Sequence, residues 1–559
     1  MKMQNDKIAT DKPQGTAIPL TMIPLTFLGL ALRFWQGLVK GMSVKGMKSI
    51  ARFRKTKSLS CASSRSAMTL KCIAAASAVT VALIDPASDA DAAANTPTFT
   101  EQVAPIIFQN CASCHRLGEI GPFPLLTYQD VRKHAKQIAE VTATRFMPPW
   151  HAESGHVEFL NPRVLSENQI DTLRRWHETG AAEGDPKKLP KLPAFPEGWQ
   201  LGKPDLVLKM DRPFKLYAEG KDIYRNFVFP LNVPEDKWVR AVEFRPGARS
   251  IVHHALFYLD VTGAAREADD ADPEPGYQDK GRAGRQFTPV GGWAVGSNVR
   301  VLPDGLAYRY PKNADLVVQT HFHPTGKAEE EITTIGLHFT DKPKQSFVGI
   351  QLPPAFGEIS GIDIPAGETN YVIRDTITLP VDVEAFSIAG HAHYLAKVMT
   401  LKATLPDGHE QILVKIPDWD FAWQEQYTFK QRVKLPKGTR LDSELIYDNS
   451  ATNPHNPTSP PVRVKWGPMS TDEMGSVTLH VVAVLEEETA ALRDALREHS
   501  ADLVIDRALQ RPDRSPMVKS MLERFDKNGD GKMDADERPD LRDFIKNSGW
   551  LPGGLNNTF

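Results

Sequence analysis

The amino-acid sequence predicts a multidomain protein with a helical domain, two mainly antiparallel, jelly-roll-like β-sandwich domains and a helical tail. Its 559 residues exceed what one hydrophobic core supports. Between residues 204 and 487, short apolar runs alternate with turns rich in Pro and Gly, a spacing typical of β-sandwiches. Helical patterns occur on both sides of this region.

The charge distribution separates the first 94 residues from the rest of the chain. They contain 13 Lys and Arg against 5 Asp and Glu, although the whole chain has a formal net charge of −2. The remainder is therefore acidic. An acidic protein argues against nucleic acid or an anionic membrane surface as the partner.

Residues 1–94 have the pattern of a secretory leader. A basic stretch, 45–71, precedes an apolar run, 72–84, and an Ala-rich exit at 91–94. This order predicts a signal peptide and export to a bacterial periplasm. The apolar run is too short for a comfortable membrane span, so we expect no stable span in the mature chain; the alternative is a retained anchor. We expect residues 1–94 to be absent from the mature protein or disordered.

The predicted helical domain, 95–185, carries a C-x-x-C-H motif. Cys111 and Cys114 supply the two thiols that attach a c-type haem, and His115 supplies a ligand for its iron. A chance match and half of a zinc site are the alternatives. Because c-type haem is attached outside the cytoplasm, the motif agrees with the leader. The long β region contains no cysteine, so we expect it to fold without disulfides.

The sixth ligand of the haem iron is expected after a predicted helix over 130–146. We assign it to Met147, because a Met/His ligand pair raises the reduction potential, with His151 as the alternative. Ser166 begins a capping-box pattern and a helix through Trp176. This helix resembles the closing helix of class I cytochromes c. The other histidines of the domain are interpreted as surface or packing residues: His134, His156 and His177.

A linker rich in Pro and Lys, 186–203, separates the helical domain from the β region and should act as a semi-rigid spacer. The β region is too long for a single sandwich of ordinary size. We therefore place one β-sandwich domain at 204–345 and a second at 346–487.

Six histidines of the β region fall in three tight groups. The pairs at 321–323 and 391–393 each place two imidazoles on one strand face, because strand side chains alternate with period two. His253 and His254 are adjacent, so they need a bulge or different ring nitrogens to share a metal; the alternative is one core and one surface histidine. Met474 adds a thioether that favours copper(I) over zinc, although a lone Met is usually core filler.

The order of these motifs resembles the copper type II, ascorbate-dependent monooxygenases, the family of peptidylglycine α-hydroxylating monooxygenase and dopamine β-monooxygenase. The resemblance covers about residues 204–487 and is carried by Ile251-Val252-His253-His254, Thr320-His321-Phe322-His323-Pro324, Gly390-His391-Ala392-His393 and Asp472-Glu473-Met474. It implies an electron-transfer copper held by His253, His254 and His321. It also implies an oxygen-binding copper, where C–H cleavage occurs, held by His391, His393 and Met474. We interpret His323 as a supporting residue.

Two departures from the family limit what the resemblance implies. The animal relatives have copper domains rich in disulfides, and this β region has no cysteine. The residues that anchor the family's substrates are not found in this sequence either. The resemblance therefore implies the chemistry and the two coppers but no particular substrate.

The tail, 488–559, contains a twelve-residue loop at 526–537 that matches an EF-hand. Its ligand positions suit calcium, with Gly531 at the sharp turn and a bidentate Glu at the twelfth position. The sequence shows only one such loop, which favours a structural calcium site over a calcium sensor. The expected calcium ligands are Asp526, Asn528, Asp530, Lys532, Asp534 and Glu537.

Together these features predict an exported copper-dependent monooxygenase, an oxidoreductase that uses O2 on a small organic molecule. We expect its electrons to come from ascorbate, from the fused c-type haem, or from both, with a redox partner at the haem domain. The alternative is a non-enzymatic electron-transfer or copper-holding protein on the same scaffold. A zinc hydrolase is a third hypothesis, but this function would leave the haem motif and Met474 without a role.

Overall fold

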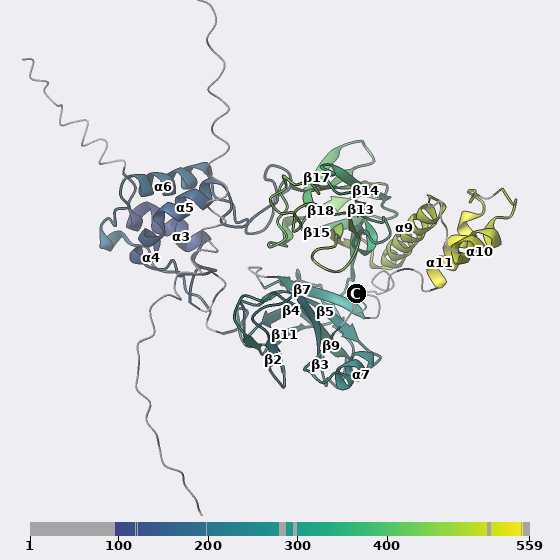
Figure 1. The fold of residues 1–559 in the computed structure, drawn as a ribbon, viewed down its shortest axis with the longest axis horizontal. Helices are drawn as coiled ribbons and strands as arrows, with labels where there is room; N and C mark the ends of the chain where they lie inside the picture. Colours follow the sequence, from purple (N-terminus) through teal and green to yellow (C-terminus); the bar gives the residue numbers. More distant parts are fainter. Residues whose placement is uncertain are drawn as a thin grey trace, which may run out of the picture. The chain divides into compact units, whose positions relative to one another are not determined.

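The computed structural model describes residues 96–117, 119, 121–196, 198–278, 287–294, 299–510, 516–530, 532–548 and 551. All of them lie in one compact unit, Asp85–Phe559. The predicted leader, 1–94, lies outside the described residues. As the sequence predicts, the described chain is multidomain and rich in antiparallel sheets, with helices before and after them (Figure 1).

The helical part precedes the sheets. It contains η1 (Phe99–Val103), α3 (Ala104–Asn110), α4 (Tyr128–Lys133), α5 (Ala135–Ala143), α6 (Glu167–Glu178) and η2 (Pro186–Lys188). Capping boxes at Thr127 and Ser166 begin α4 and α6, the second as predicted. Trp176 of α6 is fully buried in the core of this part, where its ring lies 6.3 Å from that of Phe99.

The prediction of one helix over 130–146 is wrong in one respect, because two helices, α4 and α5, cover this stretch. His134 separates α4 from α5 with φ −107° and ψ 10°, outside the α-helical region. Its ring stacks on Phe123, with 3.7 Å between the ring centroids. This contact comes from a loop outside the helix, so the local sequence pattern could not reveal the break.

Residues 206–340, the first β unit, form two main antiparallel sheets around one core. The strands are β1 (Leu206–Lys209), β2 (Phe214–Leu216), β3 (Ile223–Pro230), β4 (Lys237–Arg245), β5 (Val252–Asp260), β6 (Tyr277–Gln278), β7 (Thr288–Ala294), β8 (Tyr308–Tyr310), β9 (Asp315–Phe322), β10 (Glu329–Glu331) and β11 (Thr334–Thr340), with α7 (Ala264–Ala271) after β5. Strand orders are β1-β11-β4-β8 and β6-β3-β9-β5-β7, beside a small β10-β2 sheet. Phe244 and Phe257 meet in the core from the two main sheets.

Residues 347–483, the second β unit, repeat this plan. The elements are β12 (Phe347–Leu352), η3 (Pro354–Gly357), β13 (Asp363–Ile364), β14 (Tyr371–Thr378), β15 (Val383–Ala392), β16 (Ala396–Thr404), β17 (Glu410–Ile416), β18 (Gln426–Leu435), β19 (Arg440–Tyr447), β20 (Val464–Lys465) and β21 (Gly475–Ala483). The sheets β12-β21-β15-β18 and β14-β19-β16-β17 enclose a core that contains Leu401 and Leu479, and β13-β20 is a small third sheet.

A segment of the predicted helical domain belongs to the second β unit. Residues 150–163, the anchor segment, run beside β18, where the Leu160 N–H donates to the Thr428 carbonyl at 2.7 Å. Phe159 is buried in the core of that unit, and its ring lies 5.2 Å from that of Tyr427. Helices α5 and α6 therefore flank a stretch that is fixed to the second β unit.

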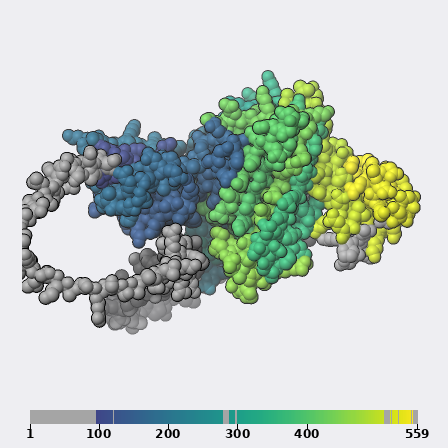
Figure 2. Space-filling view, turned by 90° about the horizontal axis from the view of Figure 1, so that it is seen from above, coloured from purple at the N-terminus to yellow at the C-terminus, as the bar shows by residue number. Residues whose placement is uncertain are grey.

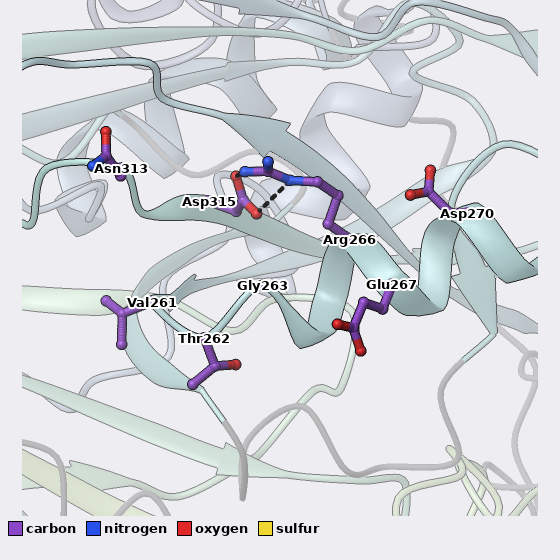
Figure 3. A pocket seen from close by; sticks show the side chains of 8 residues that line it. All are labelled: Val261, Thr262, Gly263, Arg266, Glu267, Asp270, Asn313 and Asp315. Carbon is purple, nitrogen blue, oxygen red and sulfur yellow. Dashed lines mark hydrogen bonds and ion pairs between the residues drawn. The ribbon is translucent and has the colours of Figure 1, made fainter.

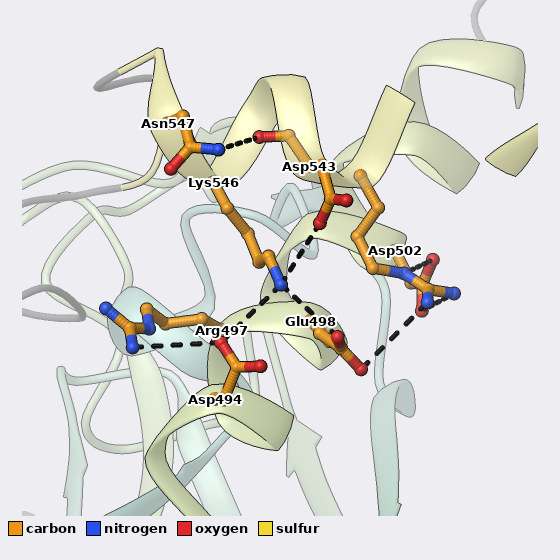
Figure 4. A network of polar contacts seen from close by, with 8 residues as sticks. Asp494, Arg497, Glu498, Asp502, Asp543, Lys546 and Asn547 are labelled. Carbon is orange, nitrogen blue, oxygen red and sulfur yellow. Dashed lines mark hydrogen bonds and ion pairs between the residues drawn. The ribbon is translucent and has the colours of Figure 1, made fainter. Parts of the chain in front are cut away.

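The tail consists of η4 (Glu486–Glu488), α9 (Thr489–Gln510), α10 (Pro516–Phe525) and α11 (Arg538–Asn547). Ion pairs join α9 to α11: the Lys546 ammonium of α11 lies 3.2 Å from the Glu498 carboxylate and 3.5 Å from the Asp494 carboxylate of α9 (Figure 4). Figure 2 shows the yellow tail against the green second β unit, where His499 of α9 pairs with buried Asp375. Within the described residues, no helix combines the length and apolarity that crossing a membrane requires.

Candidate metal centre

Strand pairing in the first β unit brings three histidines together. Strands β5 and β9 are neighbours, and His254 lies opposite His321. The register shifts between Val252 and His254, which leaves His253 as the extra residue of a β-bulge. The bulge was one of the two sequence alternatives for how adjacent histidines could share a metal.

The ring nitrogens of this triad converge. The Nδ1 atom of His254 lies 3.3 Å from Nδ1 of His253 and 3.3 Å from Nδ1 of His321. Among the described His, Cys, Asp and Glu residues, these three are the set whose ligand atoms all lie within 4.8 Å of one another. Three imidazole nitrogens aimed at one point form a site for a transition metal such as copper or zinc.

Burial favours the neutral form of two histidines of the triad. It lowers the pKa of His253 to about 4, with the nearby His321 imidazole as the second cause. It also holds the pKa of His254 well below its ordinary value, again with His321 adding to the effect. Since a metal binds the lone pair of neutral imidazole, these side chains are ready to act as ligands at neutral pH.

Asp222 is a site residue that the sequence analysis missed. Its Oδ2 accepts a hydrogen bond from Nε2 of His321 at 2.8 Å, and its Oδ1 accepts one from Nδ1 of His323 at 2.8 Å. Burial opposes ionisation of Asp222, but these two histidines hold its pKa well below the ordinary value. Asp222 precedes β3, about a hundred residues before His321, and no local motif marks it.

The second set lies at the end of β15, in the second β unit. The rings of His391 and His393 have centroids 5.5 Å apart and are inclined at 81°. Nδ1 of His391 donates to Oε1 of Gln424 at 2.6 Å, and Nδ1 of His393 donates to the Asp472 carbonyl at 3.1 Å. Each ring therefore keeps Nε2 as its lone-pair nitrogen. Burial lowers the pKa of His391 to about 4 and that of His393 to about 3.

Glu473 links the backbone of Met474 to that of His393 through hydrogen bonds. The fully buried Glu473 carboxyl accepts the backbone N–H groups of His393, Leu395 and Met474 at 2.6, 2.9 and 2.8 Å. Burial raises its pKa to about 8, against the effect of these three hydrogen bonds. The hydroxyl of Tyr447 donates to the Met474 carbonyl at 3.1 Å. The backbone of Met474 is thus fixed beside that of His393.

One aromatic ring stands between the two histidine sets. Phe421, in the loop after β17, lies 5.3 Å from the ring of His253 and 5.5 Å from the ring of His393. In the same loop, Nε1 of Trp419 donates to the His393 carbonyl at 3.1 Å. The loop, which the sequence analysis did not single out, therefore contacts both sets.

The C-x-x-C-H motif, predicted to attach haem, follows α3. Cys111 and Cys114 are free and half-buried. Nδ1 of His115 donates to the Phe123 carbonyl at 3.1 Å, which leaves Nε2 as the nitrogen with a lone pair. This tautomer suits an axial ligand of haem iron. Burial raises the pKa of Cys111 to about 12, as expected for a thiol in a packed site.

The two candidates for the sixth iron ligand lie just after α5. Met147 is half-buried, and its N–H donates to the Val141 carbonyl at 3.1 Å. His151 belongs to the anchor segment and bonds the Asp418 backbone, while its Nε2 is buried without a hydrogen-bond partner among the described residues. His151 is therefore engaged with the second β unit, which leaves Met147 as the preferred candidate.

The loop at 526–537, predicted to bind calcium, connects two helices, because α10 ends at Phe525 and α11 begins at Arg538. The Glu537 carboxylate accepts the N–H groups of Lys527 and Asp534 at 2.6 and 2.9 Å, so the twelfth loop position faces the loop backbone. Among the described residues, the loop carboxylates do not form a set within 4.8 Å of one another. Gly531 lies outside the described residues.

A surface pocket of about 370 Å³ lies at the opposite end of β5 and β9 from the histidine triad (Figure 3). The guanidinium of Arg266 pairs there with buried Asp315 at 2.6 Å. Its other lining residues are Val261, Thr262, Gly263, Glu267, Asp270 and Asn313. This pocket does not adjoin the histidines.

No family model and no curated protein matches this sequence. Solved structures with a weak likeness include N-glycanase F (PNGase F), with 13% identity, 50% of this chain and 95% of that chain covered, and a TM-score of 0.23. The major capsid protein P2 from bacteriophage PM2 has 11% identity, covers 47% of this chain and 98% of its own, and has a TM-score of 0.21. At such scores the likeness carries no argument about fold or function.

Proposed function

We propose that this protein is an exported copper-dependent monooxygenase that hydroxylates a small organic molecule with O2. The observation that carries the proposal is the pair of histidine sets that both contact Phe421, with hydrogen bonds that fix the ring tautomers of His321, His391 and His393. The triad of the first β unit takes one copper, and His391, His393 and Met474 take the other. The order of the motifs, which resembles the copper type II monooxygenases, supports the same assignment.

The ligand types favour copper over zinc. Three neutral imidazoles suit either metal, so the triad alone does not decide between them. The second set adds a thioether, which is a soft ligand that zinc rarely takes and copper(I) prefers. The haem motif also points to electron transfer, which zinc does not perform.

The protein's own groups bind and orient in this proposal. Gln424 and the Asp472 carbonyl hold the Nδ1 protons of His391 and His393, which leaves both Nε2 atoms with the lone pairs that would bind a metal. Phe421 packs an apolar ring against His253 of one set and His393 of the other. When bound, copper supplies the one-electron chemistry that O2 requires, and two coppers supply two electrons. Haem at Cys111 and Cys114 or external ascorbate is the electron source.

The metal content of the purified chain tests this proposal. We expect two coppers per haem in the wild type. Met474→Ala should reduce this ratio toward one, or remove the copper(I) affinity of the second site, because only two imidazoles remain. Met469→Ala is the matched control: its side chain is exposed in the same loop, so its copper content should equal that of the wild type.

One copper or none in the wild type, or zinc in its place, would overturn the proposal. Ascorbate-driven oxygen uptake separates the enzyme from a copper-holding protein. Uptake that is present in the wild type and lost in Met474→Ala supports the monooxygenase. A chain with two coppers and no oxygen uptake would favour the non-enzymatic alternative.

A further inference from the structure

Asp222 contacts side chains from both β units. Its Oδ2 accepts a hydrogen bond from His321 at 2.8 Å and another from the hydroxyl of Ser470 at 3.1 Å. Ser470 belongs to the second β unit, in the loop at 467–474 that ends at Met474, which we call the Met474 loop. The other oxygen of Asp222 accepts from His323, whose side chain is 62% exposed.

We propose that Asp222 is a positioning residue that fixes His321 for metal binding and joins the histidine triad to the Met474 loop. The proposal rests on the proposed function, because it concerns the same histidines. It adds a residue that neither the sequence motifs nor the ligand set contains.

The first step is the choice of tautomer. A neutral imidazole has one N–H and one lone-pair nitrogen. Because Nε2–H of His321 donates to Asp222, Nδ1 carries the lone pair, and Nδ1 is the atom that lies 3.3 Å from His254. Tyr224 stacks on the same ring at 4.3 Å and an angle of 3°, which fixes its plane. A carboxylate behind a ligating imidazole also raises its basicity.

The second step links the two histidine sets. Within the Met474 loop, the Asp472 N–H donates to the Met469 carbonyl at 2.8 Å, and the Met469 N–H donates to Oδ2 of Asp472 at 3.2 Å. This tight turn presents Ser470 to Asp222. The Asp472 carbonyl accepts from Nδ1 of His393. A short path of hydrogen bonds therefore runs from His321 through Asp222 and the turn to His393.

Copper affinity of the triad tests the first step. In a His391→Ala background, which leaves one site, we expect Asp222→Ala to raise the Cu(II) dissociation constant about 10- to 100-fold, the usual effect of losing such a partner. Asp222→Asn keeps an acceptor oxygen for His321 and should have a smaller effect, with Ser470→Ala smaller still. Asp236→Asn, a carboxylate paired with Arg309 elsewhere in the first β unit, is the matched control and should change nothing.

A measurement on the metal-free protein separates this inference from the proposed function. Nitrogen NMR of ¹⁵N-labelled histidine should show His321 as the Nε2–H tautomer in the wild type and as a mixture in Asp222→Ala. The positioning role would be overturned if the Asp222 variants bound Cu(II) as tightly as the chain with Asp222 intact and kept His321 as the Nε2–H tautomer. If the wild type binds no copper, the proposed function falls, and the tautomer alone decides the role of Asp222.

Discussion

Glu473→Ala is expected to lower the free energy of unfolding of the second β unit by about 3 kcal/mol. The substitution leaves the N–H groups of His393, Leu395 and Met474 buried without an acceptor, at about 1–3 kcal/mol for each unsatisfied group. The substitution also removes a buried carboxyl whose pKa burial raises to about 8. The cost of keeping that group away from water disappears with it, which offsets part of the loss. Urea unfolding of the metal-free protein, followed by intrinsic fluorescence, measures the difference.

Glu473→Gln is the matched variant for this prediction. Its carbonyl oxygen can replace Oε1, which accepts from His393 and Met474, while its amide group meets the Leu395 N–H as a second donor. We expect a loss of about 1 kcal/mol, for one hydrogen bond. Glu473→Ala should also weaken copper binding at the second site, since the Met474 backbone loses its attachment. A stability equal to that of the wild type in Glu473→Ala would contradict this role.

The sequence predicted the parts of the centre that local pattern encodes. Strand periodicity placed His391 and His393 on one face. Adjacency of His253 and His254 left a bulge as one of two ways to share a metal, and β5 contains a bulge there. The capping box at Ser166 is a local signal too, and α6 begins there. Each of these follows from residues within a few positions of one another.

The supporting residues could not be predicted, because tertiary packing brings them together. Asp222 reaches His321 through the pairing of β3 with β9. Gln424 and Phe421 come from a loop with no metal-binding motif, and their roles depend on which ring faces them. The anchor segment was assigned to the helical domain, because nothing in its composition indicates that Phe159 enters the core of the second β unit.

Acid is expected to destabilise the metal-free protein steeply between about pH 6.5 and pH 4. Burial lowers the pKa of His253, His391 and His480 to about 4 and that of His393 to about 3. The unfolded chain binds protons at these positions below about pH 6.5, where the folded chain does not, so stability falls as pH falls. Each histidine contributes at most about 3 kcal/mol over this range. Glu473, whose pKa is raised, makes the folded chain more stable as the pH falls. It is one group, however, against these four histidines.

His480 gives this prediction a test that is independent of metal ligands. It is half-buried beside Ser387, whose hydroxyl lies 3.1 Å from its Nδ1, and it belongs to neither histidine set. His480→Gln should therefore reduce the pH dependence of stability by about one proton. The exposed His409 is the control, and His409→Gln should leave the slope unchanged. Urea midpoints at pH 7.5, 6.0, 5.0 and 4.5 measure the slope, and a flat profile in the wild type would mean that the buried histidines accept protons in the folded state.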